Sequence, residues 1–363
     1  MRIERIVITG DVLRTSMGEP NQLPNVRWLC DELLAVLHEL TGLRPELRYR
    51  RNAADDGLAV VADWYGLLGR TPSLEAWAAT YAMAPPPALI DALAPDYERA
   101  LVIGFELSPL LRSALDSLGA PWIDAEVSPI RFLDDLAVAL RCSWPASPRP
   151  HPGLVAPAQV EEAVAGLRAR HRHDRVAAAC SGACIFLAQT RHDRTLLRDG
   201  GFFPDREVVE RVAGMLDGRR LVLKPHPLQP DNPLIGALQE QLAGRVTDAN
   251  VYALLAAASD PRFVTISSSA AIEAGHFGHS ARMLHPAAHA HPAPFASLWA
   301  HRSASFWRAV LGTILPVRAD AAFEERLVPD RLRRKLNAWG FTRPAAPAAP
   351  TAPASVASVP ESA

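Results

Sequence analysis

The sequence predicts an α/β protein with two successive halves, each built around a parallel sheet. Short apolar runs of strand length alternate with longer segments of helical periodicity over most of the chain. A proline-rich stretch, residues 143–158, divides this alternation into two series and has the composition of an interdomain linker. The length of 363 residues also suits two domains better than one.

The first half is expected to contain three buried strands with helices between them. Large apolar side chains at helical spacing stop before Gly42, as is typical of a helix end. Gly10 and Asp11 follow the first strand, where a glycine lets a ligand approach the backbone. We expect strands at residues 3–9, 100–105 and 121–124, and helices at 25–40 and 130–140.

The second half repeats the alternation and ends in a biased segment. From residue 344 onward the chain contains only Pro, Ala, Ser, Thr, Val and one Glu, which predicts a disordered tail. We expect strands at 183–187, 221–223 and 263–266, and helices at 160–170, 205–216, 234–242, 251–258, 270–275, 303–311 and 324–339. The predicted units are a first domain (1–145), a linker (146–158), a second domain (159–320), a C-terminal helix (321–343) and the tail (344–363).

Composition argues against several classes of function. The formal net charge of −1 gives no global basic field for nucleic acid, and 49% hydrophobic residues are typical of a soluble globular protein. The four cysteines show no metal-binding spacing, so we expect reduced thiols, a cytoplasmic protein and no metal site. No apolar run reaches the length of a membrane span, and the N-terminus leads into a strand rather than a signal peptide.

The strongest candidate for a binding site is a short apolar strand that runs directly into Lys224, Pro225, His226 and Pro227. Because proline cannot donate to a sheet ladder, the strand ends there, with a cation and an imidazole at its carboxyl end. Ligands of open α/β sheets bind at that edge. A lysine and a histidine suit a phosphate, whereas the alternative is an ordinary proline-rich turn.

A serine cluster is the second candidate. Ser267, Ser268 and Ser269 lie between an expected strand and an expected helix, and Glu273 lies one turn into that helix. Serine often caps a helix, but three serines exceed what one cap requires. Free N–H groups and hydroxyls at a helix N-terminus also favour an anion. We therefore expect capping together with phosphate binding, and a ribose hydroxyl on Glu273.

Two carboxylates are candidates for catalysis. Asp193 closes the segment that begins at Gln189, just past an expected strand, and a carboxylate there is well placed as a nucleophile or base. Glu106 ends a strand of the first half, so the two would face each other across an interdomain cleft, as in glycosyl chemistry. The alternatives are a loop in which Asp193 pairs with Arg191 or Arg194, and a helix cap for Glu106.

Together these motifs resemble a known family. The Lys-Pro-His-Pro segment and the serine cluster with Glu273 are similar to the HP and Ser motifs of bacterial CMP-sugar glycosyltransferases, which include sialyl-, polysialyl- and β-Kdo transferases (Kdo is 3-deoxy-D-manno-oct-2-ulosonic acid). Gln189 and Asp193 resemble the Q-x-x-x-D segment of the retaining β-Kdo transferases of capsule and O-antigen synthesis. The resemblance covers chiefly residues 180–280. Residues 198–201 match the acidic sialyltransferase motif poorly, which favours the Kdo branch.

The resemblance implies a GT-B fold, in which two Rossmann-like domains with parallel sheets face a central cleft. It implies Asp193 as nucleophile, Glu106 as general acid/base, and a donor site that needs no metal ion or other cofactor. A CMP leaving group carries one phosphate, which Lys224 and His226 can stabilise and His226 can protonate. The residues expected at the donor are Gln189, Lys224, His226, Pro227, Ser267, Ser268, Ser269 and Glu273.

The expected reaction is transfer of Kdo from CMP-β-Kdo to a bacterial surface glycan or glycolipid, with retention through an adduct on Asp193. Two other classes stay open: an inverting, sialyl-type CMP-sugar transferase, and a non-catalytic GT-B module that binds glycan. Arg331, Arg333, Arg334 and Lys335 suit peripheral contact with the inner membrane, or with a polysaccharide assembly complex there. The favoured alternative is a helix packed on the body with a solvated basic face.

Overall fold

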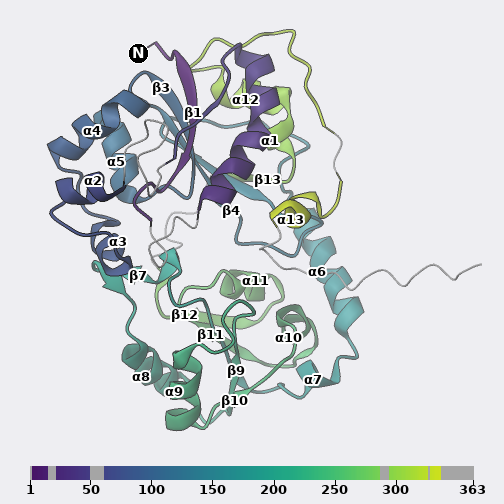
Figure 1. Ribbon diagram of the computed structural model, residues 1–363. Helices are drawn as coiled ribbons and strands as arrows, with labels where there is room; N and C mark the ends of the chain where they lie inside the picture. Colours follow the sequence, from purple (N-terminus) through teal and green to yellow (C-terminus); the bar gives the residue numbers. More distant parts are fainter. Residues whose placement is uncertain (1, 15–21, 50–60, 287–293, 326–327, 337–363) are drawn as a thin grey trace, which may run out of the picture.

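The structure, a computed structural model, is a mixed α/β protein with two main sheets that are mostly parallel (Figure 1). It describes residues 2–14, 22–49, 61–286, 294–325 and 328–336. The predicted tail at 344–363 and the last residues of the helix predicted at 324–339 lie outside the described residues.

The first sheet has six strands in the order β13-β5-β4-β3-β1-β2. Strands β1 to β4 run parallel, whereas β5 and β13 run antiparallel to their neighbours. The chain passes from β1 to β2 on one side and then to β3 on the other, so a topological switch point lies between β1 and β3. The strands are β1 (Arg5–Gly10), β2 (Glu46–Leu47), β3 (Ala100–Phe105), β4 (Trp122–Val127), β5 (Val138–Cys142) and β13 (Phe295–Ser297).

Helices cover both faces of the first sheet, with α1 and α12 on one side and α4 and α5 on the other (Figure 1). The predicted end of α1 (Leu23–Thr41) is confirmed, because Gly42 takes a φ of 74° and donates its N–H to the His38 carbonyl. The remaining helices of this half are α2 (Val61–Leu67), α3 (Leu74–Thr80), α4 (Pro87–Tyr97), α5 (Pro109–Ser117), η3 (Ala300–Arg302), α12 (Ala304–Leu311) and α13 (Arg331–Leu336).

The second sheet has five strands, all parallel, in the order β10-β9-β6-β11-β12. Numbered along the chain this is 3-2-1-4-5, the order of a Rossmann-type sheet, and its switch point lies between β6 and β11. The strands are β6 (Cys184–Leu187), β9 (Leu221–Lys224), β10 (Arg245–Val246), β11 (Arg262–Thr265) and β12 (Ser280–Met283). The helices are α6 (Pro157–His171), α7 (Arg175–Ala178), α8 (Asp205–Met215), α9 (Pro233–Leu242), α10 (Val251–Ala257) and α11 (Ala270–His276), with a short η1 (Arg194–Leu196).

A small hairpin of the second half reaches the first half. Its strands, β7 (Leu197–Arg198) and β8 (Gly201–Phe202), are joined by Asp199 and Gly200, both at positive φ, as a tight hairpin turn requires. The Phe202 ring lies 6.2 Å from the ring of Trp77 on α3. The segment at 198–201 is thus a hairpin turn between the halves (Figure 1).

Three expectations about the elements need correction. Residues 130–137 are irregular and β5 begins at Val138, so the predicted helix at 130–140 is wrong: its last three residues, 138–140, pair with β4 and β13 instead of completing a helical stripe. The predicted second domain at 159–320 includes β13 and α12, which the structure places with the first sheet and α1. Residues 324 and 325 are not helical, and α13 begins at Arg331.

Candidate active site

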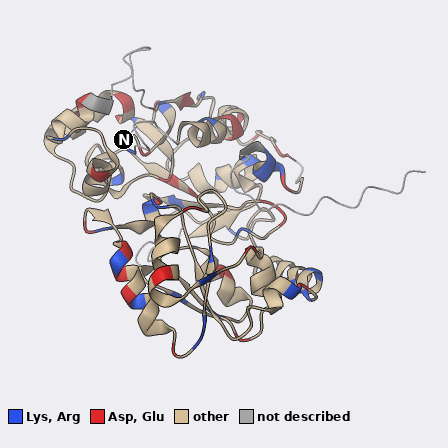
Figure 2. Ribbon diagram, turned by 60° about the horizontal axis from the view of Figure 1, so that its bottom comes forward, with Lys and Arg blue, Asp and Glu red and all other residues tan. Residues whose placement is uncertain are grey.

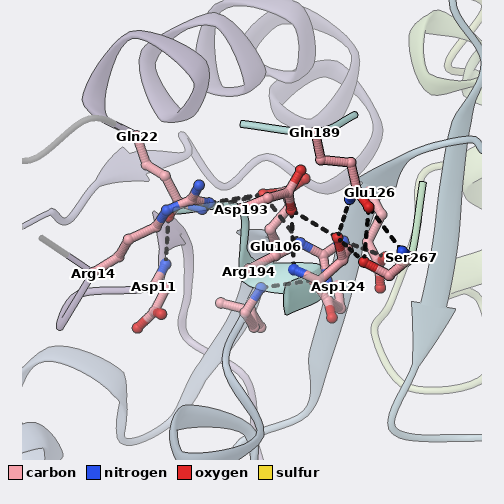
Figure 3. Close-up of polar contacts among 12 residues, drawn as sticks. Asp11, Arg14, Gln22, Glu106, Asp124, Glu126, Gln189, Asp193, Arg194 and Ser267 are labelled. Carbon is pink, nitrogen blue, oxygen red and sulfur yellow. Dashed lines mark hydrogen bonds and ion pairs between the residues drawn. The ribbon is translucent and has the colours of Figure 1, made fainter. Parts of the chain in front are cut away.

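The carboxyl ends of the two sheets meet at their switch points. Arg194, which follows β6, extends its guanidinium to two carboxylates of the first half (Figure 3). Its Nε lies 3.3 Å from Oε2 of Glu106, just past β3, and its Nη2 lies 2.7 Å from Oε2 of Glu126, in β4. The two edges at which α/β sheets bind ligands therefore face each other in one polar cluster.

Glu106 takes a backbone conformation that is rare for its residue type. Its φ is 52°, in the left-handed region, and such strain is typical of functional sites. Its Oε2 accepts hydrogen bonds from Arg14 (3.0 Å) and Gln22 (3.4 Å) and pairs with Arg194, while Oε1 accepts none from the described residues. Glu106 does not cap α5, because the hydroxyl of Ser108 does so. The carboxylate is thus held by one oxygen and presents the other.

Asp193 likewise accepts hydrogen bonds through one carboxylate oxygen. Its Oδ1 accepts the N–H and the hydroxyl of Thr195, both at 2.9 Å, and so caps η1. Its Oδ2 has no hydrogen-bond partner in the described part of the chain. Burial acts to raise the pKa of Asp193, but the bond from the Thr195 N–H and the charges of Arg14 and Arg194 outweigh it, so the pKa is lowered and the group is ionised at neutral pH.

Arg14 and Arg194 connect the two candidate catalytic carboxylates. Arg14 pairs with Glu106, lies over the ring of Trp77 at 5.3 Å, and its charge acts on Asp193. The alternative in which Arg194 pairs with Asp193 is not what the structure shows, since its ion pairs are with Glu106 and Glu126. Sequence reasoning missed the roles of Arg14 and Glu126. The sequence feature that could have identified them is the position of a charged residue at or just past the carboxyl end of a strand.

Two buried acids shape the first half of the site. Asp11, 1% exposed, accepts hydrogen bonds from Trp77 Nε1 (2.8 Å), Ser108 Oγ (3.1 Å) and the Leu13 N–H (3.2 Å). Burial raises the pKa of Asp11 and also that of Asp124, which binds Arg112. Asp11 therefore positions the loop after β1 rather than facing a ligand.

Gly10 packs against the protein itself. A Cβ there would lie 2.7 Å from Cγ2 of Val26 and 2.9 Å from Oε1 of Gln22. The close approach that requires a glycine is therefore that of α1, and not that of a ligand as expected.

Gln189 and Ser267 join the two strands of the second switch point. Gln189 Oε1 accepts the Ser267 N–H at 2.7 Å and the Ser267 hydroxyl at 3.2 Å, and Gln189 Nε2 donates to Thr195 Oγ1 at 3.0 Å. Both side chains are buried. The pair was expected at the donor, but its polar atoms bond within the protein, where they tie β6 to β11 and orient the turn that carries Asp193 (Figure 3).

Ser268 and Ser269 differ in what their hydroxyls do. The Ser268 hydroxyl accepts the Ala270 N–H at 3.3 Å, which is the expected cap of α11. Ser269 is the N-cap residue of α11, but its own side chain makes no capping hydrogen bond. Both are partly exposed, so Ser269 is the serine whose hydroxyl is open to a ligand.

Glu273 is buried at 3% exposure rather than open to a ribose. Its Oε1 accepts the Arg131 N–H at 2.8 Å and the Tyr252 hydroxyl at 3.2 Å. Burial raises its pKa to about 7. Because Arg131 lies in the loop between β4 and β5, Glu273 holds the first half against α11.

Lys224 and His226 lie where the sequence predicts, at the carboxyl end of β9, next to exposed Pro227. His226 Nδ1 accepts the Leu228 N–H at 3.2 Å, so the neutral ring carries its proton on Nε2. Burial lowers the pKa of both groups. The structure therefore presents an ammonium and an imidazole Nε2–H together beside the turn that carries Asp193.

The loops after β6 and β9 are tied to each other. The Arg191 N–H donates to Gln229 Oε1 at 2.7 Å, which joins the segment before Asp193 to the segment after His226. The charge of Asp193 acts on the His226 ring, in the direction that raises its pKa. The candidate nucleophile and the candidate phosphate ligand thus belong to one cluster.

The basic helix α13 packs on the body of the protein. Leu332 is fully buried, Arg331 pairs with the buried Glu32 at 3.0 Å, and Arg333 pairs with Asp330 at 2.9 Å. These contacts favour the packed alternative over a lipid-facing helix. Among the described residues, no helix is both long and apolar enough to cross a membrane, and no group of three or more His, Cys, Asp or Glu side chains is arranged to hold a metal ion.

No protein-family model matches the sequence, and no curated protein matches it. Among solved structures, the chain is similar to KpsC, a β-Kdo 2,7-transferase of Thermosulfurimonas dismutans, with 15% sequence identity and a TM-score of 0.35 over 58% of this chain and 75% of that one. A TM-score of this size does not establish a shared fold, so the function has to be argued from the site.

Proposed function

We propose that this chain is a GT-B glycosyltransferase that moves Kdo from CMP-β-Kdo to a glycan or glycolipid acceptor with retention of configuration. One observation carries the proposal. Two carboxylates from opposite halves, Asp193 and Glu106, are each held by one oxygen and present the other, at the point where both switch points meet. Glycosyl transfer with retention needs such a pair, one as nucleophile and one as acid/base.

In the first step Asp193 Oδ2 attacks the anomeric carbon, and the bond from that carbon to the phosphate oxygen breaks as CMP leaves. In the second step the acceptor hydroxyl gives its proton to Glu106 Oε1, and its oxygen displaces Asp193 from the anomeric carbon. Two inversions at one carbon restore the original configuration. The lowered pKa of Asp193 suits the first step, because a nucleophilic carboxylate has to be ionised.

The leaving phosphate is proposed to bind Lys224, His226 and Ser269. Since the pKa of His226 is lowered, its ring is neutral near pH 7 and stabilises the phosphate as an Nε2–H donor rather than as a cation. An anion bound there would raise that pKa, so we expect a proton to bind to His226 together with CMP, and this proton uptake strengthens the histidine–phosphate contact as the pH falls. The cationic Lys224 supplies the fixed charge, and the proposal includes no metal ion or other cofactor.

Calorimetry with CMP tests the donor site. His226→Ala and Lys224→Ala should each weaken CMP binding about 10- to 150-fold, which corresponds to a charge-assisted contact of roughly 1.5–3 kcal/mol. His173→Ala, at an exposed histidine beyond the end of α6, is the control and should bind CMP like the wild type. Unchanged CMP affinity in both site variants would refute the phosphate role.

Nuclear magnetic resonance with CMP-β-Kdo tests the reaction. CMP release and a product of retained configuration are expected. An inverted product would make Asp193 or Glu106 a general base, as in the sialyl-type alternative. Binding of glycan without CMP release from any donor would favour a non-catalytic module. The proposed acceptor would be met at the cytoplasmic face of the inner membrane, with or without an assembly complex.

A further inference from the structure

Thr195 lies at the centre of the hydrogen bonds around the candidate nucleophile. Its hydroxyl donates to Asp193 Oδ1 at 2.9 Å, because an ionised carboxylate can only accept. Two other side chains reach the same hydroxyl oxygen: Gln189 Nε2 at 3.0 Å and Ser267 Oγ at 3.0 Å. Gln189 follows β6 and Ser267 follows β11, so both strands of the second switch point hold the threonine that holds Asp193.

The direction of each of these hydrogen bonds follows from one backbone group. The Ser267 N–H can only donate, and it lies 2.7 Å from one end of the Gln189 amide. That end is therefore the oxygen, and the end that faces Thr195 is the NH₂ group, which donates. Since the one hydroxyl proton of Thr195 goes to Asp193, the close approach of the Ser267 hydroxyl requires that its proton points at Thr195. The Thr195 hydroxyl thus donates once and accepts twice, which fixes its orientation.

This arrangement places strong donors on one oxygen of Asp193. A hydroxyl that accepts two hydrogen bonds becomes a better donor, because the bonds of a chain polarise one another. Together with its own N–H, also at 2.9 Å, Thr195 gives Oδ1 two donors. Burial acts to raise the pKa of Asp193, and both donors are among the groups that lower it. The proposed attacking oxygen is the other one, Oδ2.

We infer that Thr195 is a positioning residue of the transfer reaction, whose hydroxyl makes Asp193 a good leaving group in the second step. This inference rests on the proposed function and extends it. In the adduct, Oδ2 is bonded to the anomeric carbon and Oδ1 is the neutral carbonyl oxygen of an ester. When the acceptor oxygen displaces Oδ2, its proton passes to Glu106 and the electron pair of the breaking bond returns to Asp193. The hydrogen bonds from Thr195 then become charge-assisted and stronger, which speeds this step.

The same hydroxyl acts differently on the first step. It stabilises the carboxylate before the attack, which lowers the nucleophilicity of Asp193, while it also fixes the direction of Oδ2. Removing the hydroxyl should therefore slow the breakdown of the adduct much more than its formation. A purely structural role of Thr195 would slow both steps alike.

Intact-protein mass spectrometry after rapid quenching measures both steps with CMP-β-Kdo alone. Adduct formation is followed first, the donor is then removed by gel filtration, and water takes the place of the acceptor while the adduct decays. Thr195→Val keeps the shape and the N–H but loses the hydroxyl. Its adduct should decay about 5- to 30-fold more slowly than that of the wild type, with the rate of formation changed less than about 3-fold. Thr195→Ser should restore wild-type rates.

Thr41→Val is the matched control. The Thr41 hydroxyl donates to the Leu37 carbonyl at 2.6 Å and accepts the Leu43 N–H at 3.1 Å, but it lies at the C-terminal end of α1. Both rates should be those of the wild type in this variant.

The pH dependence of adduct formation is a second measurement. Attack needs an ionised Asp193, and loss of the Thr195 hydroxyl raises the pKa of that carboxylate, so the acid limb should move to higher pH in Thr195→Val. Thermal unfolding checks that each variant folds. If Thr195→Val does not fold, Thr195→Cys replaces it, since its thiol is a weak donor and should also slow the decay.

Each result has a distinct meaning. Wild-type decay of the adduct in Thr195→Val would overturn the inference and leave the proposed function standing. Equal slowing of formation and decay would also overturn it, because Thr195 would then only maintain the fold of the turn. Absence of an adduct in the wild-type protein would overturn both proposals.

Discussion

Asp193 is the cap of η1 and the proposed nucleophile, and substitutions can separate these two roles. As the cap of η1, its Oδ1 accepts two bonds from Thr195, and an asparagine oxygen can accept the same bonds. Asp193→Asn should therefore keep the cap and lose only the favourable interaction of the carboxylate with Arg14 and Arg194. Asp193→Ala should lose the cap as well, which costs about 1 kcal/mol more. An amide cannot act as the nucleophile, so both variants should lose transfer by at least roughly 10⁴-fold.

Asp174 provides a matched control away from the site. Its side chain caps α7 by accepting the Ala177 N–H at 2.9 Å. Asp174→Ala should lose about as much stability as the loss of the cap costs in Asp193→Ala, and it should keep full transfer activity. Denaturant unfolding measures the stability of each variant, CMP release measures transfer, and calorimetry measures CMP affinity. CMP affinity should be nearly unchanged in both Asp193 variants.

Intact-protein mass spectrometry gives the direct test. With donor and no acceptor, the wild type should gain the mass of one sugar, and Asp193→Asn should not. If Asp193→Asn transfers sugar at the wild-type rate, the aspartate is only a cap and the mechanism is wrong.

Two further predictions follow from the same region. Burial raises the pKa of Glu273 from its ordinary 4.5 to about 7, so between these pH values the folded chain keeps a proton that the unfolded chain releases, and stability falls as the pH rises. Between pH 5 and pH 7, the free energy of unfolding should fall by roughly 2 kcal/mol less in Glu273→Gln than in the wild type, as measured by urea denaturation. An equal fall in both proteins would contradict the raised pKa of Glu273. Ser268→Ala should lower the melting temperature, because its hydroxyl caps α11, whereas Ser269→Ala should leave it unchanged and weaken CMP binding about 3- to 10-fold. Calorimetry and thermal unfolding check both, and a drop in melting temperature for Ser269→Ala would count against an open hydroxyl.

Periodicity was sufficient to predict most of the longer helices and six strands, but not β5, the edge strands of either sheet or the β7–β8 hairpin. The six predicted strands are β1, β3, β4, β6, β9 and β11. The run at residues 100–105 is the clearest case, since β3 covers the same residues and is buried on both faces, which requires continuous apolar character. The helix expected at 130–140 failed because strand pairing with β4 and β13 outweighs local periodicity. The placement of residues 295–311 on the first half depends on contacts remote in sequence, which local patterns do not contain.

The candidate site could be predicted in part. Motif position placed Asp193, Glu106, Lys224 and His226 at strand ends, which follows from the topology of parallel sheets. The position of a motif did not predict which polar side chains would be buried within the protein. Gln189, Ser267 and Glu273 satisfy buried backbone and hydroxyl groups instead of facing solvent. Such partner choices depend on the distance between elements, as does the reach of Arg194 into the other half.

The return of the chain to the first sheet has a practical consequence for dissecting the protein. β13 is the edge strand next to β5, although the two strands are more than 150 residues apart in the sequence. A fragment cut at the proline-rich segment would end in an unpaired β5 and would also lack α12, which packs on α1. An open edge of this kind recruits other chains, so expressing the N-terminal half alone invites aggregation. A separately folding unit would need the downstream segment grafted back, for example by deleting residues 157–285 and closing the gap with a flexible linker.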